Sequence, residues 1–323
     1  VGSEMCIRDR LMAVMAVGLI ACGTDKSDNE STKEEKTSVT ITSLDASKNE
    51  IELEVPYNPK RIAILDLASL DIIDELGVGD RVVGMASTSI DYLEKYSNDA
   101  SIKNLGTIKE ADLEAVMECE PDIIFIGGRL SKSYDALSEI APVVYLATDT
   151  NEGLVNSVSK NAKTIASIFG MEDKVDSLMS DFGARIDAIK KISSGKTALV
   201  GMTTSGSFNL LGNDGRCSLI GVEAGFNNLT AAGSTSTHGN ESSFETVVQQ
   251  NPDYIFVMDR DSAISTAGAK TAKEIVENEL VKTTDAYKNN HIIYLEHSNV
   301  WYTAEGGIQA LDIMLTDLEK GLK

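Results

Sequence analysis

An eighteen-residue segment occurs twice in this chain, at residues 112–129 and again at residues 243–260, and the two copies align without a gap. Both copies contain an amphipathic stretch, a Pro-Asp pair, a short apolar run and a final arginine. Proline cannot continue a helix and aspartate favours tight turns, so each copy predicts a helix that turns back into a buried strand. The duplication therefore predicts two related α/β halves. The identical positions are Glu114/Glu245, Val116/Val247, Pro121/Pro252, Asp122/Asp253, Ile124/Ile255, Phe125/Phe256 and Arg129/Arg260.

Short apolar runs alternate with helical segments throughout both halves. This alternation predicts an α/β fold of two Rossmann-like lobes, each with a mostly parallel sheet covered by helices on both faces. A β-hairpin is expected before them, because residues 39–44 and 51–55 alternate apolar and polar side chains. The expected strands are 61–65, 81–86, 122–128, 141–147, 197–202, 207–212, 253–258 and 291–295. The expected helices are 67–77, 111–120, 216–225, 242–250 and 306–320.

A single apolar stripe runs along the segment between the halves. Val175, Leu178, Phe182, Ile186 and Ile189 recur at spacings of three and four residues, which is typical of one face of a helix. We expect one long rigid helix over residues 172–193, about 30 Å long at ~1.5 Å per residue. It would join an N-terminal lobe at 39–171 to a C-terminal lobe at 194–323 and limit how far the lobes can hinge.

The first 38 residues carry signals for export. Leu11–Ala21 is apolar but too short to span a bilayer as a helix, and two arginines precede it. It ends in the sequence LIAC, which resembles the bacterial lipoprotein signal that is cleaved before a lipid-bearing cysteine. We expect a signal peptide at 1–21, lipidation of Cys22, and a disordered polar tether at 22–38. The alternative is a plain signal peptide with a chance cysteine, and the unusual residues 1–10 suggest a truncated or foreign beginning.

The charge of the chain argues against two classes of partner, and its cysteines argue against disulfides. The chain has 29 basic and 50 acidic residues, a formal net charge of −21, which argues against binding to nucleic acid or to anionic lipid surfaces. With Cys6 and Cys22 in the leader, only Cys119 and Cys217 remain, one in each half. We therefore expect no disulfide framework.

The duplicated arginines fall at a position where α/β proteins bind ligands. Arg129 and Arg260 each follow the end of an apolar strand, and the ligand crevice of open α/β sheets lies outside that carboxyl edge. Glu114 and Glu245, in the first turns of the preceding helices, should lie near the same face. We expect two lobes that clamp a ligand between them. The alternative is that the arginines only pair with local carboxylates at the strand ends.

Further stretches, taken in order, make the chain similar to a known family. From Val39 to the C-terminus it resembles the substrate-binding lipoproteins of bacterial iron–siderophore ABC importers, the two-lobed class joined by one long helix, and among them the petrobactin and catecholate-type binders. The stretches are NPKRIAILD (58–66), DLEAVMECEPDIIFIGGR (112–129), YDALSEIAPVV (134–144), GNDGRCSLI (212–220), STHGNES (236–242), NPDYIFVMDR (251–260) and IIYLEHSNVWYTAEGG (292–307).

The resemblance implies a function and a location. It implies an extracytoplasmic monomer, held at the cell membrane by its N-terminal lipid. It would need no cofactor, bind a ferric siderophore between its lobes, and deliver it to a permease and, through it, to an ATPase. Arg129, Arg216 and Arg260 would form the basic cluster that receives the anionic ligand, because guanidinium groups suit catecholate and carboxylate oxygens.

The resemblance assigns the remaining site residues less specific roles. His238 and Tyr302 match positions that complete the iron shell in some relatives, although a plain loop histidine and a packed aromatic ring are the alternatives. Trp301 and Tyr302 would instead line the pocket by stacking on catechol rings. Lys109 would add a donor at the rim unless it is simply solvated, and Arg216 is otherwise a surface residue. Glu114 and Glu245 would dock on the permease, or stabilise their helix N-termini.

Other functions fit the sequence less well. No G-x-S-x-G, H-E-x-x-H or P-loop motif is present, so we do not expect an enzyme. Zinc or manganese importers need several histidines and carboxylates around a bare ion, and this chain has three histidines in all. A haem- or cobalamin-binding protein of the same transporter class is the alternative. Three arginines favour a compact, highly negative ligand.

Overall fold

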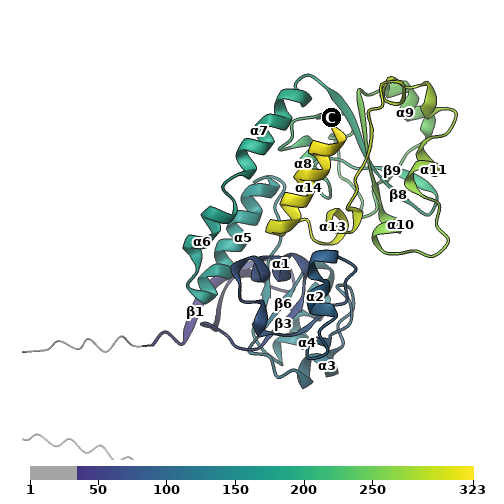
Figure 1. The fold of residues 1–323 in the computed structure, drawn as a ribbon. Helices are drawn as coiled ribbons and strands as arrows, with labels where there is room; N and C mark the ends of the chain where they lie inside the picture. The colour runs from purple at the N-terminus through teal and green to yellow at the C-terminus, as the bar shows by residue number, and fades with distance from the viewer. Residues whose placement is uncertain (1–34) are drawn as a thin grey trace, which may run out of the picture. The chain divides into compact units, whose positions relative to one another are not determined.

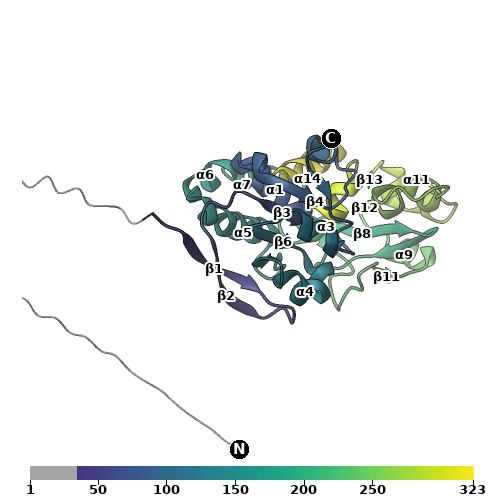
Figure 2. The same cartoon turned by 90° about the horizontal axis from the view of Figure 1, so that it is seen from below.

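The computed structural model describes residues 35–323, and everything below concerns this part of the chain. The predicted signal peptide and Cys22 lie outside it. The antiparallel hairpin comes first, with β1 (Ser38–Leu44) paired to β2 (Glu50–Pro56) in a register that sets Ile41 opposite Leu53. Ser38, assigned to the tether from sequence, instead belongs to this hairpin, because it pairs with Pro56. Figure 2 shows the hairpin beside the N-terminal sheet.

The N-terminal lobe, called the N-lobe below, is built on a five-stranded sheet in the order β5-β4-β3-β6-β7. All neighbouring strands are parallel, so their carboxyl ends meet at one edge. The strands β3 and β6 consist of buried apolar residues throughout, as expected for a sheet covered on both faces. The strands are β3 (Ile62–Leu65), β4 (Val82–Met85), β5 (Lys103–Asn104), β6 (Ile123–Ile126) and β7 (Val143–Tyr145). The helices are α1 (Leu67–Leu76), α2 (Glu94–Ser97), α3 (Leu113–Glu118), α4 (Tyr134–Ser138) and α5 (Leu154–Phe169).

The C-terminal lobe, called the C-lobe below, has a mixed sheet in the order β11-β9-β8-β12-β13, with β10 paired to β8. Strands β8, β12 and β13 are parallel, whereas β9 and β11 run antiparallel to their neighbours. The strands are β8 (Thr197–Thr204), β9 (Ser207–Leu210), β10 (Asn227–Asn228), β11 (Asn240–Glu241), β12 (Tyr254–Asp259) and β13 (Ile292–Tyr294). The helices are α8 (Ser218–Gly221), α9 (Phe244–Gln250), α10 (Arg260–Ala263), α11 (Ala272–Val276), α12 (Asp285–Lys288), α13 (Ser298–Thr303) and α14 (Ile308–Gly321). The α/β fold class predicted from sequence is confirmed.

The duplicated segment adopts the same structure in both lobes. The residue before the proline has a positive φ in each copy, 45° at Glu120 and 41° at Asn251, which ends the helix abruptly. The aspartate after the proline then fixes the neighbouring strand. Asp122 Oδ2 accepts hydrogen bonds from the backbone N–H groups of residues 60 and 61, before β3. Asp253 Oδ2 accepts from the backbone N–H and the hydroxyl of Thr197, at the start of β8.

The connection between the lobes differs from the single helix predicted over 172–193. It consists of α6 (Glu172–Leu178) and α7 (Phe182–Ser193), separated by a turn at residues 179–181 (Figure 1). The hydroxyl and the backbone N–H of Ser180 both bond to the carbonyl of Ser177, and serine competes in this way with regular helical bonding. The apolar stripe is kept, because Val175, Phe182 and Ile186 are all buried.

One hydrophobic core continues from the N-lobe into the C-lobe through α1, α5, α7 and α14. The joint between α1 and α14 is also polar. Asp71 of α1 accepts hydrogen bonds from the backbone N–H groups of Gln309 and Ala310, each at 2.9 Å, and thereby caps α14 from the other lobe. Gly307 is required there, because a Cβ atom would stand 2.3 Å from Asp71 Oδ2.

Within residues 35–323, no helix has the length and continuous apolar character needed to cross a bilayer. Cys119 and Cys217 are buried free thiols in separate lobes.

Candidate ligand-binding site

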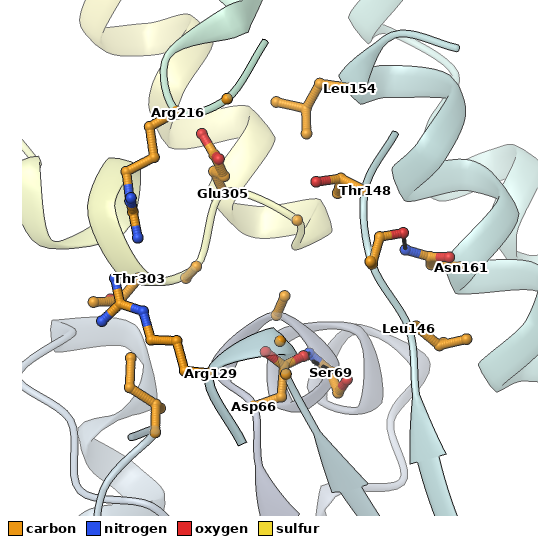
Figure 3. Close-up of a pocket in the computed structure, with 18 of the residues that line it drawn as sticks. Asp66, Ser69, Arg129, Leu146, Thr148, Leu154, Asn161, Arg216, Thr303 and Glu305 are labelled. Carbon is orange, nitrogen blue, oxygen red and sulfur yellow. Dashed lines mark hydrogen bonds between the residues drawn. The ribbon is translucent and has the colours of Figure 1, made fainter. Parts of the chain in front are cut away.

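A cavity of about 640 Å³ lies between the lobes. The N-lobe contributes the segments that follow three parallel strands: Asp66 after β3, residues 127–129 after β6, and residues 146–150 after β7. The C-lobe contributes residues 214–216 and 302–306. The cavity thus lies at the carboxyl edge of the N-lobe sheet, where the sequence predicts a ligand crevice. Figure 3 shows Arg129 and Arg216 pointing toward each other on one side of the cavity, with Thr148 and Asn161 on the other.

Tyr302 of α13 is the centre of the basic cluster. The guanidinium carbons of Arg216, Arg129 and Arg260 lie 4.4, 4.9 and 5.7 Å from the centroid of its ring. Cations over an aromatic face are attracted by its quadrupole, so one ring holds three like charges together. The structure therefore brings together the three arginines and the tyrosine that the sequence singled out.

The three arginines differ in how their donors are used. Arg260 Nε donates to the Tyr302 hydroxyl at 3.1 Å, and its Nη1 lies 3.5 Å from Asp261 Oδ1. Arg216 donates to the backbone carbonyls of Tyr302 and Thr237 at 3.2 and 3.0 Å. Arg129 Nη1 is buried and has no hydrogen-bond partner among the described residues. Leaving such a donor unpaired costs about 1–3 kcal/mol.

The electrostatics of the cluster favour bound negative charge. Burial lowers the pKa of the Arg216 guanidinium, and the charge of Arg129 lowers it further. Burial alone would raise the pKa of the Tyr302 phenol, but the hydrogen bond from Arg260 and the other arginine charges outweigh it, so that pKa lies below its ordinary value. Within the described chain, neither Arg129 nor Arg216 has a carboxylate within ion-pair distance. Arg260 is paired with Asp261, whereas the charges of Arg129 and Arg216 have no paired counter-ion in this part of the chain.

Trp301 does not line the cavity, which corrects the expectation from sequence. Its side chain is 0% exposed, and its Nε1 donates to Asp317 Oδ2 of α14 at 2.9 Å. Neighbouring residues of a helix point in directions about 100° apart, so anchoring Trp301 in the core turns Tyr302 toward the arginines. The buried tryptophan therefore helps to orient Tyr302, although it does not contact the cavity itself.

Lys109 and His238 lie at the periphery of the cluster. Lys109 is exposed and lines an adjoining hollow of about 400 Å³, which shares Arg129 and Thr303 with the main cavity. His238 is exposed in a loop, and its backbone carbonyl accepts a hydrogen bond from Asn209. Partial burial and the nearby arginine and lysine charges lower the pKa of its imidazole, which favours the neutral, metal-ligating form.

Glu114 and Glu245 occupy equivalent exposed positions outside the cavity. Each is the second residue of its helix, after a capping Asp112 in one lobe and a capping Ser243 in the other. The side chains of Asp112 and Ser243 already accept hydrogen bonds from the backbone N–H groups of the first helical turns. The two glutamates are therefore not needed as caps and can face solvent or a partner.

Sequence reasoning missed two acidic residues that line the cavity. Burial raises the pKa of the Asp66 carboxyl, although Ser69 donates to it twice. Burial also raises the pKa of the Glu305 carboxyl to about 7. The signal for Asp66 was available, because it directly follows β3 as Arg129 follows β6. Glu305 lies in the turn between α13 and α14. In a turn, the sequence pattern does not predict the direction in which a side chain points.

One further cluster, Glu296, His297 and Asp317, has ligand types suited to a metal, but its side chains already bond to one another or to neighbouring residues. Asp317 accepts from both Trp301 Nε1 and His297 Nδ1, and Glu296 pairs with Lys320 at 2.9 Å. These contacts join the α13 region to α14, and the three residues of the cluster do not line the cavity.

Comparisons with known proteins agree with this site and fold. The family model described as periplasmic binding protein matches residues 62–298. The petrobactin-binding protein YclQ of Bacillus subtilis is 36% identical and covers 96% of both chains, and its crystal structure superposes with a TM-score of 0.81 over 88% of this chain and 99% of that one.

Two proteins from Vibrio species are also similar. The ferric-anguibactin-binding protein FatB of Vibrio anguillarum is 27% identical over 83% of this chain and 84% of that protein. The periplasmic catecholate-siderophore binding protein VctP of Vibrio cholerae is 30% identical, with a TM-score of 0.79 over 87% of this chain and all of that one. All three relatives are binding proteins, which agrees with the prediction that this chain is not an enzyme. The matched region and the shared length show that the chain belongs to the periplasmic binding protein family.

Proposed function

We propose that this chain is the extracytoplasmic solute-binding component of an ABC importer and captures an anionic ferric siderophore of catecholate or mixed type between its lobes. The single observation that carries the proposal is the group of three guanidinium carbons within 5.7 Å of the Tyr302 ring, with one buried donor unpaired. Each charge-assisted contact to a ligand oxygen contributes about 1.5–3 kcal/mol. The overall charge of −21 does not prevent capture, since distant charges are screened beyond about 8 Å.

The relatives support the substrate class. YclQ is named for petrobactin, FatB for ferric anguibactin, and VctP for catecholate siderophores. A cavity of about 640 Å³ with a second hollow beyond Arg129 has room for a bulky, branched iron complex. Lys109 in that hollow would give one more donor to the rim of the ligand.

Tyr302 and His238 are proposed to complete the iron shell when the siderophore leaves positions open. The lowered pKa values of the phenol and of the imidazole both favour the forms that bind iron. The ligand would have to draw Tyr302 away from the hydrogen bond that Arg260 makes to its hydroxyl.

Delivery is proposed to use the outer surface of both lobes. Glu114 and Glu245 would dock on a permease, which in turn couples to an ATPase, and a lipid on Cys22 would hold the monomer at the outer face of the cell membrane. The relatives YfiY and YhfQ of Bacillus subtilis carry the term lipoprotein in their names, which supports this location.

Calorimetric titration tests the proposal. Ferric catecholate, mixed citrate and hydroxamate siderophores are compared with haem and cobalamin. We expect submicromolar affinity for a catecholate or mixed complex, and at least a tenfold loss, about 1.4 kcal/mol, for each of Arg129→Ala, Arg216→Ala and Arg260→Ala. Arg61→Ala is the control, because Arg61 donates to the Cys119 carbonyl away from the cavity. Saturation by haem or cobalamin alone would contradict the proposal.

A further inference from the structure

Glu305 is an acidic residue in the same cavity as the arginine cluster. It lines the same cavity as Arg129 and Arg216, and Figure 3 shows it beside Arg216. One of its oxygens, Oε2, accepts a single long hydrogen bond of 3.3 Å from the backbone N–H of Cys217. In the described part of the chain, Oε1 has no hydrogen-bond partner and no cation lies within 4 Å of the carboxylate.

The fold uses only one oxygen of this carboxylate, for the contact to Cys217. Glu305 lies in the turn between α13 and α14 and caps neither helix, because Asp71 supplies the cap of α14. The charge of Arg216 lowers the pKa of Glu305, but within the described residues the two side chains form no ion pair, since Arg216 Nε and Nη1 donate to backbone carbonyls.

A second carboxylate, that of Glu223, acts electrostatically on Glu305. The charge of Glu223 acts on Glu305 and helps burial to raise its pKa. Glu223 Oε1 accepts from the backbone N–H of Val155, at the start of α5, while its Oε2 is buried without a partner among the described residues. Among the described residues, the Cys217 N–H is the one hydrogen-bond donor to the Glu305 carboxylate.

A ligand carrying only negative groups would be repelled by this side of the cavity. A protonated amine, in contrast, would occupy the free oxygen of Glu305 and restore the charge balance through a charge-assisted hydrogen bond. Building on the proposed function, we propose that Glu305 is a specificity-determining residue that binds a protonated amine of the siderophore while the arginine cluster holds its iron-chelating groups. The substrate class is then a catecholate or mixed chelator with a cationic backbone.

A pair of matched ligands tests the proposal. We would compare the iron(III) complexes of two synthetic bis-catecholates of equal linker length, one with a secondary amine in the linker and one with an ether oxygen in its place. For the wild-type protein at pH 7.5, we expect the amine complex to bind at least tenfold more tightly. In Glu305→Gln the two dissociation constants should agree within about twofold, with the ether complex bound no more weakly than by wild type.

Two further measurements sharpen the test. Glu54→Gln, an exposed change on the hairpin, should keep the full preference for the amine. Because the pKa of Glu305 is about 7, its charge is lost as pH falls below 7, so the wild-type preference should shrink between pH 8 and pH 5.5.

The outcomes separate the two proposals. Tight binding of both complexes by wild type with no preference for the amine would overturn the role of Glu305 and leave siderophore capture intact. A preference that Glu305→Gln retains would overturn it equally. Binding of neither complex, together with failure of the natural siderophores, would overturn both.

Discussion

At the scale of single residues, the arginine cluster places affinity for an anion in conflict with stability. Three guanidinium groups surround one ring, and Arg129 Nη1 is buried without a partner in the described chain. Like charges at close range repel, and an unpaired buried donor costs free energy that only a ligand restores. Binding sites commonly carry such strain at the expense of the folded state.

Arg129→Gln should therefore separate stability from binding. The ligand-free variant should gain about 1 kcal/mol in the free energy of unfolding, because one repelling charge and one unpaired donor are removed. Its affinity for the ferric siderophore should fall at least tenfold. Urea denaturation and calorimetric titration measure the two quantities.

Arg61→Gln is the matched comparison for this experiment. It removes donors that bond to the carbonyls of Cys119 and Glu120, so it should lower stability and leave affinity unchanged. An Arg129→Gln variant that loses stability as Arg61→Gln does would contradict the interpretation.

At the scale of secondary-structure elements, α1 and α14 are joined through a carboxylate with a perturbed pKa. Burial raises the pKa of Asp71 to about 6, although Tyr92 and the N–H groups of α14 donate to it. The folded pKa lies above the unfolded value of 3.8, so the folded state binds more protons between these values. Protonation of Asp71 therefore contributes to the free energy of unfolding. This contribution is fully present below pH 3.8 and is lost as pH rises through about 6.

Asp71→Asn should reduce the dependence of the free energy of unfolding on pH between 5 and 7. For the ligand-free protein that retains Asp71, the free energy of unfolding should increase as pH falls from 7 to 5, whereas the Asp71→Asn variant should show a smaller slope. The measurement is urea denaturation at pH 5, 6 and 7. Both proteins should carry Glu305→Gln, because that carboxyl has a raised pKa near 7 and contributes in the same direction. Identical slopes in the two proteins would refute the assignment.

Much of this architecture was predictable from local pattern, and the failures have physical causes. The strand ends that carry Arg129 and Arg260 follow from a duplicated motif and from the geometry of parallel sheets. Helix α5 was missed although Leu154, Val158, Ala162 and Ile165 follow helical spacing and are buried. The interruption between α6 and α7 depends on a side-chain bond of Ser180, which an apolar stripe does not reveal.

The candidate site was predictable to a similar degree. Arg129 and Arg260 were found because a strand end fixes their location, whereas Asp66, at the end of β3, was missed although the same argument applies to it. Trp301 was placed on the wrong side of α13, since its direction depends on Asp317 of α14, sixteen residues later in the chain. Glu305 lies in a turn, and its place in the cavity follows only from the packing of both lobes.

At the scale of the whole molecule, the duplication gives each lobe one equivalent exposed glutamate. Charge reversal at both positions, Glu114→Lys with Glu245→Lys, should abolish iron uptake by cells and leave the affinity for the ferric siderophore unchanged. Each substitution opposes a helix dipole and costs only about 0.3–1 kcal/mol, so the protein should remain folded. Uptake of radiolabelled complex and calorimetric titration are the two measurements.

A control variant with the same change in net charge is available on other surfaces. Glu54→Lys with Asp173→Lys alters exposed residues of the hairpin and of α6 and should transport normally. Normal uptake by the Glu114/Glu245 variant would remove the docking role of these residues.

The burial of Trp301 has a practical consequence for studying this protein. The chain contains one tryptophan, and it lies directly behind the ring that the three arginines surround. An iron complex in the cleft absorbs light at the wavelengths that a shielded indole emits. Intrinsic emission would therefore report occupancy from a single, fixed position, with no dye attached and no signal from a second indole to subtract.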